Sequence, residues 1–89
     1  GLVILESMLM GNPVVAYDEG SVSEIIQNGE SGIVVPKGDL HSLSNITFEL
    51  ISDVGLYSHL SKAGIRSVLK NFSLEEFKNS VLSEIRLDR

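Results

Sequence analysis

One carboxylate, Glu6, stands in an otherwise apolar run over residues 2–10. An ionised side chain is costly to bury without a partner, so Glu6 either faces water or lines a polar cleft. If this run is a helix, the leading amides at Gly1, Leu2 and Val3 lack partners within it and carry the positive end of its dipole. Such amides bind phosphate without a lysine, and a glycine lets a ligand approach closely. The opening turn is therefore a candidate diphosphate-binding site.

Other residue types that commonly carry out catalysis do not form a recognisable set. The chain contains no cysteine, which excludes disulfides, thiolate metal sites and thiol nucleophiles. His41 and His59 fall on different expected helices without ligand spacing, and no Ser, His and Asp set indicates a triad. Lys37 either contacts a phosphate or is an ordinary turn lysine. We therefore expect no metal site and no cofactor.

The elements that position Glu6 come from the pattern around it. Residues 2–10 could be a buried strand or a buried helix, but Leu, Met and Glu favour a helix. Gly11-Asn12-Pro13 then supplies a stop, because glycine suits the position after a helix and proline cannot continue one. Residues 13–17 predict a short buried strand, followed by a loop over residues 18–20.

A second helix and strand follow the same loop. Ser21 and Glu24 spell a capping box, in which the Ser21 hydroxyl accepts from the Glu24 amide at the start of a helix. We expect this helix to run through Gln27 and to end at Asn28-Gly29. Residues 32–35 predict a second short strand, which Pro36 closes.

The remainder of the chain predicts three helices. Asp39 and Asp53 are expected N-caps, and Ser73 with Glu76 spells another capping box. Gly64 weakens the middle helix by about 1 kcal/mol relative to alanine. The predicted apolar faces are Leu40, Leu43, Ile46, Phe48, Leu50 and Ile51; then Leu56, Leu60, Ala63, Val68 and Leu69; then Leu74, Phe77, Val81 and Ile85.

Strands that alternate with helices indicate an α/β fold with a parallel sheet. Two short strands cannot form a stable sheet alone, so we expect further strands before Gly1. Ligands of such sheets bind at the carboxyl ends of the strands. Three segments should share that rim: the helix start at residues 1–3, the loop at 18–21 and the loop at 36–39.

Size and charge limit the possible functions. With 89 residues the chain is one small domain or a piece of a larger one, and no apolar run reaches the roughly 18–20 residues of a membrane span. The net charge is −5, and no basic residue precedes Lys37. The later basic residues are interspersed with acidic ones, which is typical of solvent-exposed helix faces. We therefore expect no nucleic-acid partner. The absence of cysteine fits a cytoplasmic protein.

Several segments in order resemble the retaining glycosyltransferases with two facing Rossmann-like domains, the GT-B group called glycosyltransferase family 4 or group 1. Their signature is two glutamates separated by seven residues. Glu6 matches the second, and the first would lie three residues upstream of Gly1. The other matching segments are Gly11–Ala16 (Gly-x-Pro-Val-Val-Ala), Asp18–Ile26 (Asp-x-Gly-Gly-x-x-Glu-Ile-Val), Asn28–Pro36 (Asp-Gly-x-x-Gly-Leu-Leu-Val-Pro) and Phe72–Glu75 (Phe-Ser-Trp-Glu). Ser21 replaces a glycine and Leu74 a tryptophan.

The resemblance implies a partial Rossmann-like sheet from the C-terminal half of a GT-B donor domain. Residues 1–39 would form the alternating donor-site part and residues 40–89 the helical part. Glu6 would hold the ribose of a nucleoside diphosphate sugar, and the amides of residues 1–3 would contact its sugar or diphosphate. No catalytic residue would lie in this chain, because the first glutamate, which holds the donor sugar, is missing.

The resemblance also implies what these residues need around them. The acceptor would be a sugar, a lipid-linked glycan or a small molecule, and it would bind with the help of a missing N-terminal domain. No divalent metal would be required. The 89 residues alone would be inactive. The whole protein would be cytoplasmic, or peripheral to the membrane through that domain.

Two other interpretations fit the same order of strands and helices. One is a non-catalytic α/β module that binds nucleotides or regulates another protein, because fold does not fix function. The other is a sugar-nucleotide epimerase of related two-domain shape. The residue at the first glutamate position would distinguish a transferase from the non-catalytic module, and product analysis would distinguish it from an epimerase.

Overall fold

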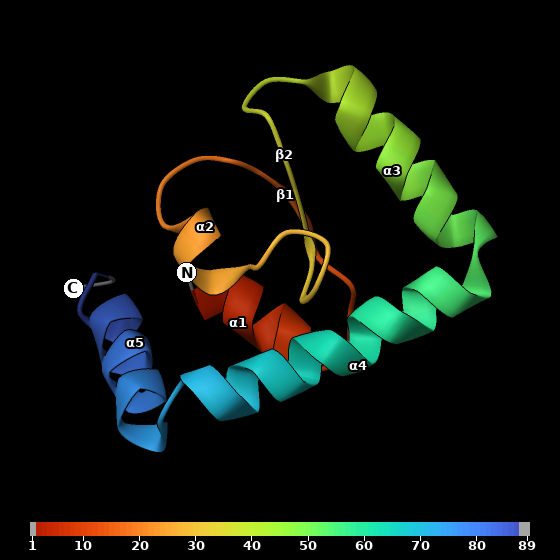
Figure 1. The fold of residues 1–89 in the computed structure, drawn as a ribbon. Coiled ribbons are helices and arrows are strands. Elements are labelled where there is room, and N and C mark those ends of the chain that lie inside the picture. Colours follow the sequence, from red (N-terminus) through yellow and green to blue (C-terminus); the bar gives the residue numbers. More distant parts are fainter. Residues whose placement is uncertain (1, 88–89) are drawn as a thin grey trace.

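The computed structural model describes residues 2–87, apart from the side chains of residues 80 and 84–87. Helices and strands alternate in the first part of the chain, and the second part is helical (Figure 1). The elements are α1 (Leu2–Leu9), β1 (Val15–Tyr17), α2 (Val22–Ile25), β2 (Ile33–Val35), α3 (Leu40–Ser52), α4 (Val54–Asn71) and α5 (Leu74–Leu87). The predicted α/β class and the order of its elements are confirmed.

Helix α1 ends at the predicted stop. Gly11 has a φ of +83°, in the left-handed region that favours glycine. Its amide donates to the Met8 carbonyl at 3.0 Å, and the Asn12 amide donates to the Ser7 carbonyl at 3.0 Å. The Ser61 hydroxyl of α4 donates to the Gly11 carbonyl at 2.6 Å. The turn that closes α1 is thereby fastened to α4.

Strands β1 and β2 pair in parallel, as predicted. The register places Val15 opposite Ile33 and Tyr17 opposite Val35. The two carboxyl ends therefore lie side by side, and the loops after them leave the sheet at the same edge. Each strand is shorter than predicted. Strand β1 begins at Val15, two residues after the predicted start at Pro13, and β2 begins at Ile33, one residue after Gly32.

The outer edge of β2 is partly covered by a side chain. Ile33 faces β1, since its amide donates to the Val14 carbonyl at 2.9 Å. Successive residues of a strand direct their backbone groups to opposite sides, so Val34 faces away from β1. The Val34 amide donates to Oδ1 of Asn28 at 2.9 Å. The side chain of Asn28 thus takes the place of a neighbouring strand at this position.

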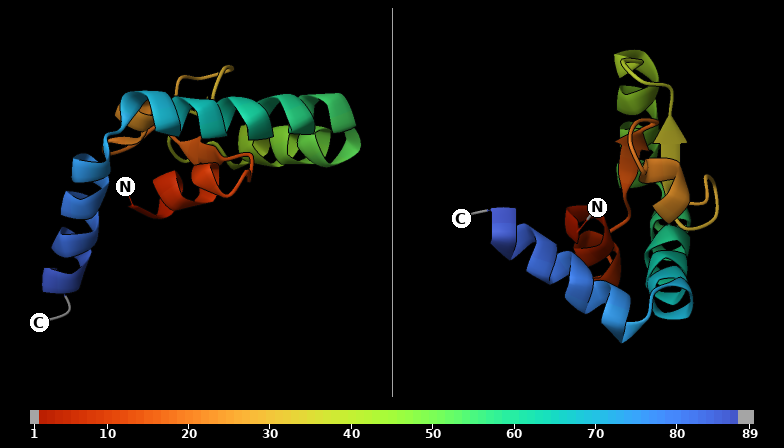
Figure 2. Two further views of the ribbon diagram at one scale, coloured as in Figure 1. Left: turned by 90° about the horizontal axis from the view of Figure 1, so that it is seen from below. Right: turned by 90° about the vertical axis from the view of Figure 1, so that its left-hand side faces the viewer.

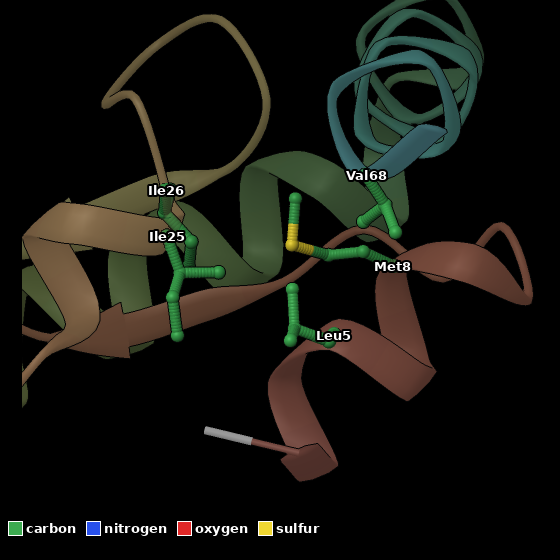
Figure 3. Packing of buried hydrophobic residues seen from close by; sticks show 5 residues of the cluster. All are labelled: Leu5, Met8, Ile25, Ile26 and Val68. Carbon is green, nitrogen blue, oxygen red and sulfur yellow. The ribbon is translucent and has the colours of Figure 1, made fainter. Parts of the chain in front are cut away.

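The core lies between α1, α2 and α4. Its buried members are Leu5, Met8, Ile25, Ile26 and Val68. Figure 3 shows Leu5 and Met8 of α1 beside Ile25 and Ile26, with Val68 of α4 close to Met8. The side chain of Met8 is fully buried. These residues fix the rotation of α1 about its axis, and so decide which of its side chains face solvent.

The later helices frame this unit. In Figure 1, α3, α4 and α5 run along three sides of the part formed by α1, α2 and the strands. Helix α4 packs against α1, α3 packs against α4 and β1, and α5 contacts α1. Within residues 2–87, no helix combines the length and apolar character that crossing a bilayer requires.

The prediction for the second helix is wrong in two respects. The Ser21 hydroxyl forms no capping hydrogen bond; the Glu24 amide donates instead to the Ser21 backbone carbonyl at 3.0 Å. The helix also ends at Ile25, before the expected Gln27. A helix of four residues has few internal hydrogen bonds, so burial of Ile25 and Ile26 has more influence on its geometry than local capping does.

The caps of the longer helices are confirmed. Asp39 accepts from the Ser42 amide at 3.0 Å, and Asp53 accepts from the Leu56 amide at 3.0 Å. The Ser73 hydroxyl accepts from the Glu76 amide at 3.0 Å. The carboxylate or hydroxyl of a cap lies only three residues before the amide that it accepts from. The sequence alone was therefore sufficient to predict these caps.

The predicted apolar faces are only partly buried. Leu50, Leu60 and Val68 are buried, whereas five of the predicted members are exposed. The exposed ones are Leu40, Phe48, Ile51, Leu69 and Leu74. On α3 the apolar residues cover more than one side of the helix, and one side alone packs against α4 and β1. The side chain of Ile85 lies outside the described residues.

Candidate functional site

The first turn of α1 lies on the same side of the molecule as the strand ends. Figure 2 (right) shows α1 running opposite to the two strands, so its start points toward the side where β1 and β2 end. The three predicted rim segments therefore share one side. Gly1 itself lies outside the described residues, and the amides of this turn that can be placed are those of Leu2 and Val3.

The two loops after the strands are joined to each other. The Asp18 amide donates to the Val35 carbonyl at 2.7 Å. Further out, Nζ of Lys37 lies 3.7 Å from Oε2 of Glu19. Both side chains are largely exposed, at 73% for Lys37 and 52% for Glu19. An exposed pair of this kind contributes at most about 1 kcal/mol, so it can separate easily when a ligand arrives.

The packing of α1 determines where its candidate residues face. Leu5 and Met8 point into the core. Glu6 is exposed, Val3 is 74% exposed and Leu2 is half-buried. Leu2 and Glu6 are four residues apart, so they lie one above the other on the helix surface. The structure thus brings the first turn and Glu6 together on the solvent side of α1.

Glu6 has the exposure expected of an unpaired carboxylate. Among the described side chains, which leave out residues 80 and 84–87, none forms a hydrogen bond or an ion pair within 4 Å with Glu6. Its acceptor oxygens are therefore available to hydroxyl donors of a ligand. None of the described basic side chains forms an ion pair with it, and Lys37, the first basic residue of the chain, lies beside Glu19 instead.

The charge at this rim is mainly negative. Asp18, Glu19 and Glu24 are exposed near the strand ends. Asp39 begins α3, and hydrogen bonds from the Ser42 hydroxyl (2.6 Å) and amide (3.0 Å) lower the pKa of its carboxyl. A bound phosphate would therefore rely on helix amides, because few cations are present. Within the described residues no group of three or more His, Cys, Asp or Glu side chains could hold a metal ion.

A concavity between α4 and the loop before β2 was not predicted. The basic residues that line it are Arg66 and Lys70. Their four-residue spacing is a signal that sequence analysis could have used, because such residues share one side of a helix. The contact of the loop with α4 could not have been anticipated.

Comparison with known proteins decides the family of this chain. Residues 1–53, more than half of the chain, match the family model described as Glycosyl transferases group 1. The chain belongs to the group 1 glycosyl transferases. The matched residues include α1, both strands and α3 up to its end, so the match covers all three rim segments.

Two curated relatives illustrate the similarity. The chain is 30% identical over 76 residues to N-acetyl-alpha-D-glucosaminyl L-malate synthase of Bacillus anthracis, a match covering 85% of this chain and 20% of that protein. It is 35% identical over 81 residues to the lipopolysaccharide core biosynthesis mannosyltransferase LpcC of Rhizobium leguminosarum bv. viciae, covering 91% and 23%. The chain thus spans about a fifth of the length of these relatives.

A solved structure shows the same fold. Sucrose-phosphate synthase from Thermosynechococcus elongatus superposes with a TM-score of 0.79 at 29% identity, covering 98% of this chain and 22% of that one. The fold is that of part of a GT-B glycosyltransferase. The predicted family and fold class are confirmed, whereas the roles assigned to Leu2, Val3 and Glu6 stay predictions.

Proposed function

We propose that the protein to which this chain belongs transfers a glycosyl group from a nucleoside diphosphate sugar to an acceptor, with retention at the anomeric carbon. The chain supplies part of the donor site, with the alternating part at residues 1–39 and the helical part at 40–89. One observation carries this proposal. In a group 1 glycosyl transferase, the first turn of α1 lies on the side of the strand ends, and the exposed carboxylate of Glu6 follows it on the same helix.

Each group has a role that follows from its chemistry. The amides of Gly1, Leu2 and Val3 donate to the diphosphate, where the helix dipole favours negative charge. The Glu6 carboxylate accepts hydrogen bonds from two ribose hydroxyls, which are strong because the acceptor is ionised. The first glutamate and the acceptor-binding domain lie outside these 89 residues. We therefore expect no transfer activity from the chain alone.

Substitution of Glu6 tests the donor site. In the natural full-length protein, Glu6→Gln should raise the Kd of the nucleoside diphosphate by about 10- to 100-fold, because hydrogen bonds to a charged group contribute about 1.5–3 kcal/mol. The measurement is calorimetric titration with a series of nucleoside diphosphates. Glu49→Gln, which removes an exposed carboxylate from α3, should leave the Kd within twofold. An unchanged Kd in Glu6→Gln would show that Glu6 is an ordinary solvated helix residue.

Product analysis tests the reaction itself. The full-length protein, supplied with labelled nucleotide sugar and an acceptor, should release nucleoside diphosphate and form a glycoside. NMR of that product should show the anomeric configuration of the donor. An inverted product would refute retention. Conversion of the donor to an epimer, without transfer, would refute the transferase assignment.

A further inference from the structure

We infer that the concavity between α4 and the loop over residues 27–31 is a second binding site, for a small phosphate-bearing ligand. It has a volume of about 350 Å³, which lies at the lower end of the range for small-molecule sites. The lining residues are Gln27, Glu30, Ser31, Ala63, Arg66, Ser67, Lys70 and Asn71. The inference does not rest on the proposed donor site, because this loop precedes β2 and the rim follows it.

The charge of α4 is unusual for this chain. The protein has a net charge of −5, yet α4 contains three basic residues and no acidic one. Lys62, Arg66 and Lys70 follow one another at four-residue intervals, so they form a line along one side of the helix. Arg66 and Lys70 of this line border the concavity, and Lys62 does not. Positive charge is therefore gathered beside an open concavity in which a ligand could bind.

Both walls of the concavity are held in place. In the loop, Ser31 is buried and its hydroxyl accepts from the Gln27 amide at 2.9 Å. The loop sits against α4 at Gly64, where an added Cβ would lie 3.4 Å from the Ser31 carbonyl oxygen. On α4, the side-chain amide of Asn71 donates to the Ser67 hydroxyl at 3.3 Å. The loop and the helix are thus fixed relative to each other, while the side chains of Arg66 and Lys70 remain exposed to an incoming ligand.

The available groups match a phosphate better than a neutral ligand. Neither Arg66 nor Lys70 has an ion pair within 4 Å among the described residues. A guanidinium binds phosphate oxygens in a two-pronged fashion, and an ammonium adds a second charge. The Gln27 side-chain amide adds an N–H donor. Glu30 is the one carboxylate of the lining, and it repels a bare phosphate while accepting from the hydroxyls of a phosphate ester.

Local hydrogen exchange in the natural full-length protein tests the inference. Inorganic phosphate should slow exchange in peptides that cover residues 27–31 and 63–71, and its concentration dependence gives a local Kd. Arg66→Gln with Lys70→Gln should raise that Kd at least tenfold, because two charge-assisted contacts are lost, even after screening by solvent. Glu30→Gln should lower it severalfold. Lys62→Gln, the matched control on the same line, should change it less than twofold.

The inference would be overturned by an absence of phosphate-dependent protection at residues 27–31, by an equal loss of affinity in Lys62→Gln, or by an unchanged Kd in the double variant. Exchange of α1 peptides without phosphate checks that the double variant is folded.

Comparison of inorganic phosphate with glycerol 3-phosphate and glycerol shows whether the site binds the free ion or a phosphate ester. Tighter binding of glycerol 3-phosphate identifies an ester as the ligand, and equal binding identifies the free ion. Protection by glycerol as strong as by glycerol 3-phosphate would also refute a phosphate site.

Discussion

Replacing Gly64 by alanine should stabilise α4, although Gly64 is buried where the loop over residues 27–31 meets the helix. Glycine inside a helix costs about 0.8–1 kcal/mol relative to alanine. An added Cβ would lie 3.4 Å from the Ser31 carbonyl oxygen and 3.8 Å from Cβ of Met8, which are ordinary van der Waals distances. The methyl group therefore fits without displacing the backbone. The net change should be close to 1 kcal/mol in favour of the folded helix.

Hydrogen exchange of α4 peptides in the full-length protein measures this change. A stabilisation of 1 kcal/mol slows exchange through local opening about fivefold. Ala63→Gly, at the neighbouring position of the same helix, should speed exchange by a similar factor and isolates the effect of helix propensity. Gly64→Val adds two more carbon atoms at a crowded point and should destabilise α4 by about 1–3 kcal/mol. Faster exchange in Gly64→Ala would refute the reasoning, because it would mean that the loop requires a glycine there.

Three further outcomes follow from the site and its supports. The carboxyl of Asp39 has a lowered pKa because it accepts hydrogen bonds from Ser42, so its cap is fully effective above about pH 4 and is lost as pH falls through the lowered value. The protection factor at the start of α3, which compares its exchange rate with that of an unstructured peptide at the same pH, should fall over that acidic range in the wild-type protein and not in Asp39→Asn. Ser61→Ala leaves the Gly11 carbonyl without its 2.6 Å donor and should destabilise the end of α1 by about 1 kcal/mol, measured by exchange of α1 peptides. If helix amides supply the positive charge, as proposed, treatment with EDTA should leave the glycosyl transfer rate unchanged; a loss restored by Mg²⁺ would contradict this.

The sequence predicted the elements that depend on short-range signals. Asp39 and Asp53 cap their helices because each carboxylate reaches an amide three residues later. The run around Val15 forms a strand because β-branched residues fit a half-buried sheet. The capping box at Ser21 failed for the opposite reason: α2 has four residues, and long-range burial of Ile26 outweighs its local signal.

The candidate rim was also within reach of sequence reasoning. Parallel strands place their following loops at one edge, so the proximity of Asp18 and Val35 follows from topology. The exposure of Glu6 follows from the cost of burying its charge. The concavity beside Arg66 was not predictable, because it depends on Ser31 and Gly64 approaching across more than thirty residues of sequence. No local pattern encodes such a contact.

The bond from the Val34 amide to Asn28 has a consequence for self-association. An uncovered strand margin is a template on which another polypeptide can align and begin an aggregate. Asn28 already occupies the donor that an incoming chain would need at the middle of β2. The protein can therefore carry a three-residue border strand without recruiting copies of itself at that position.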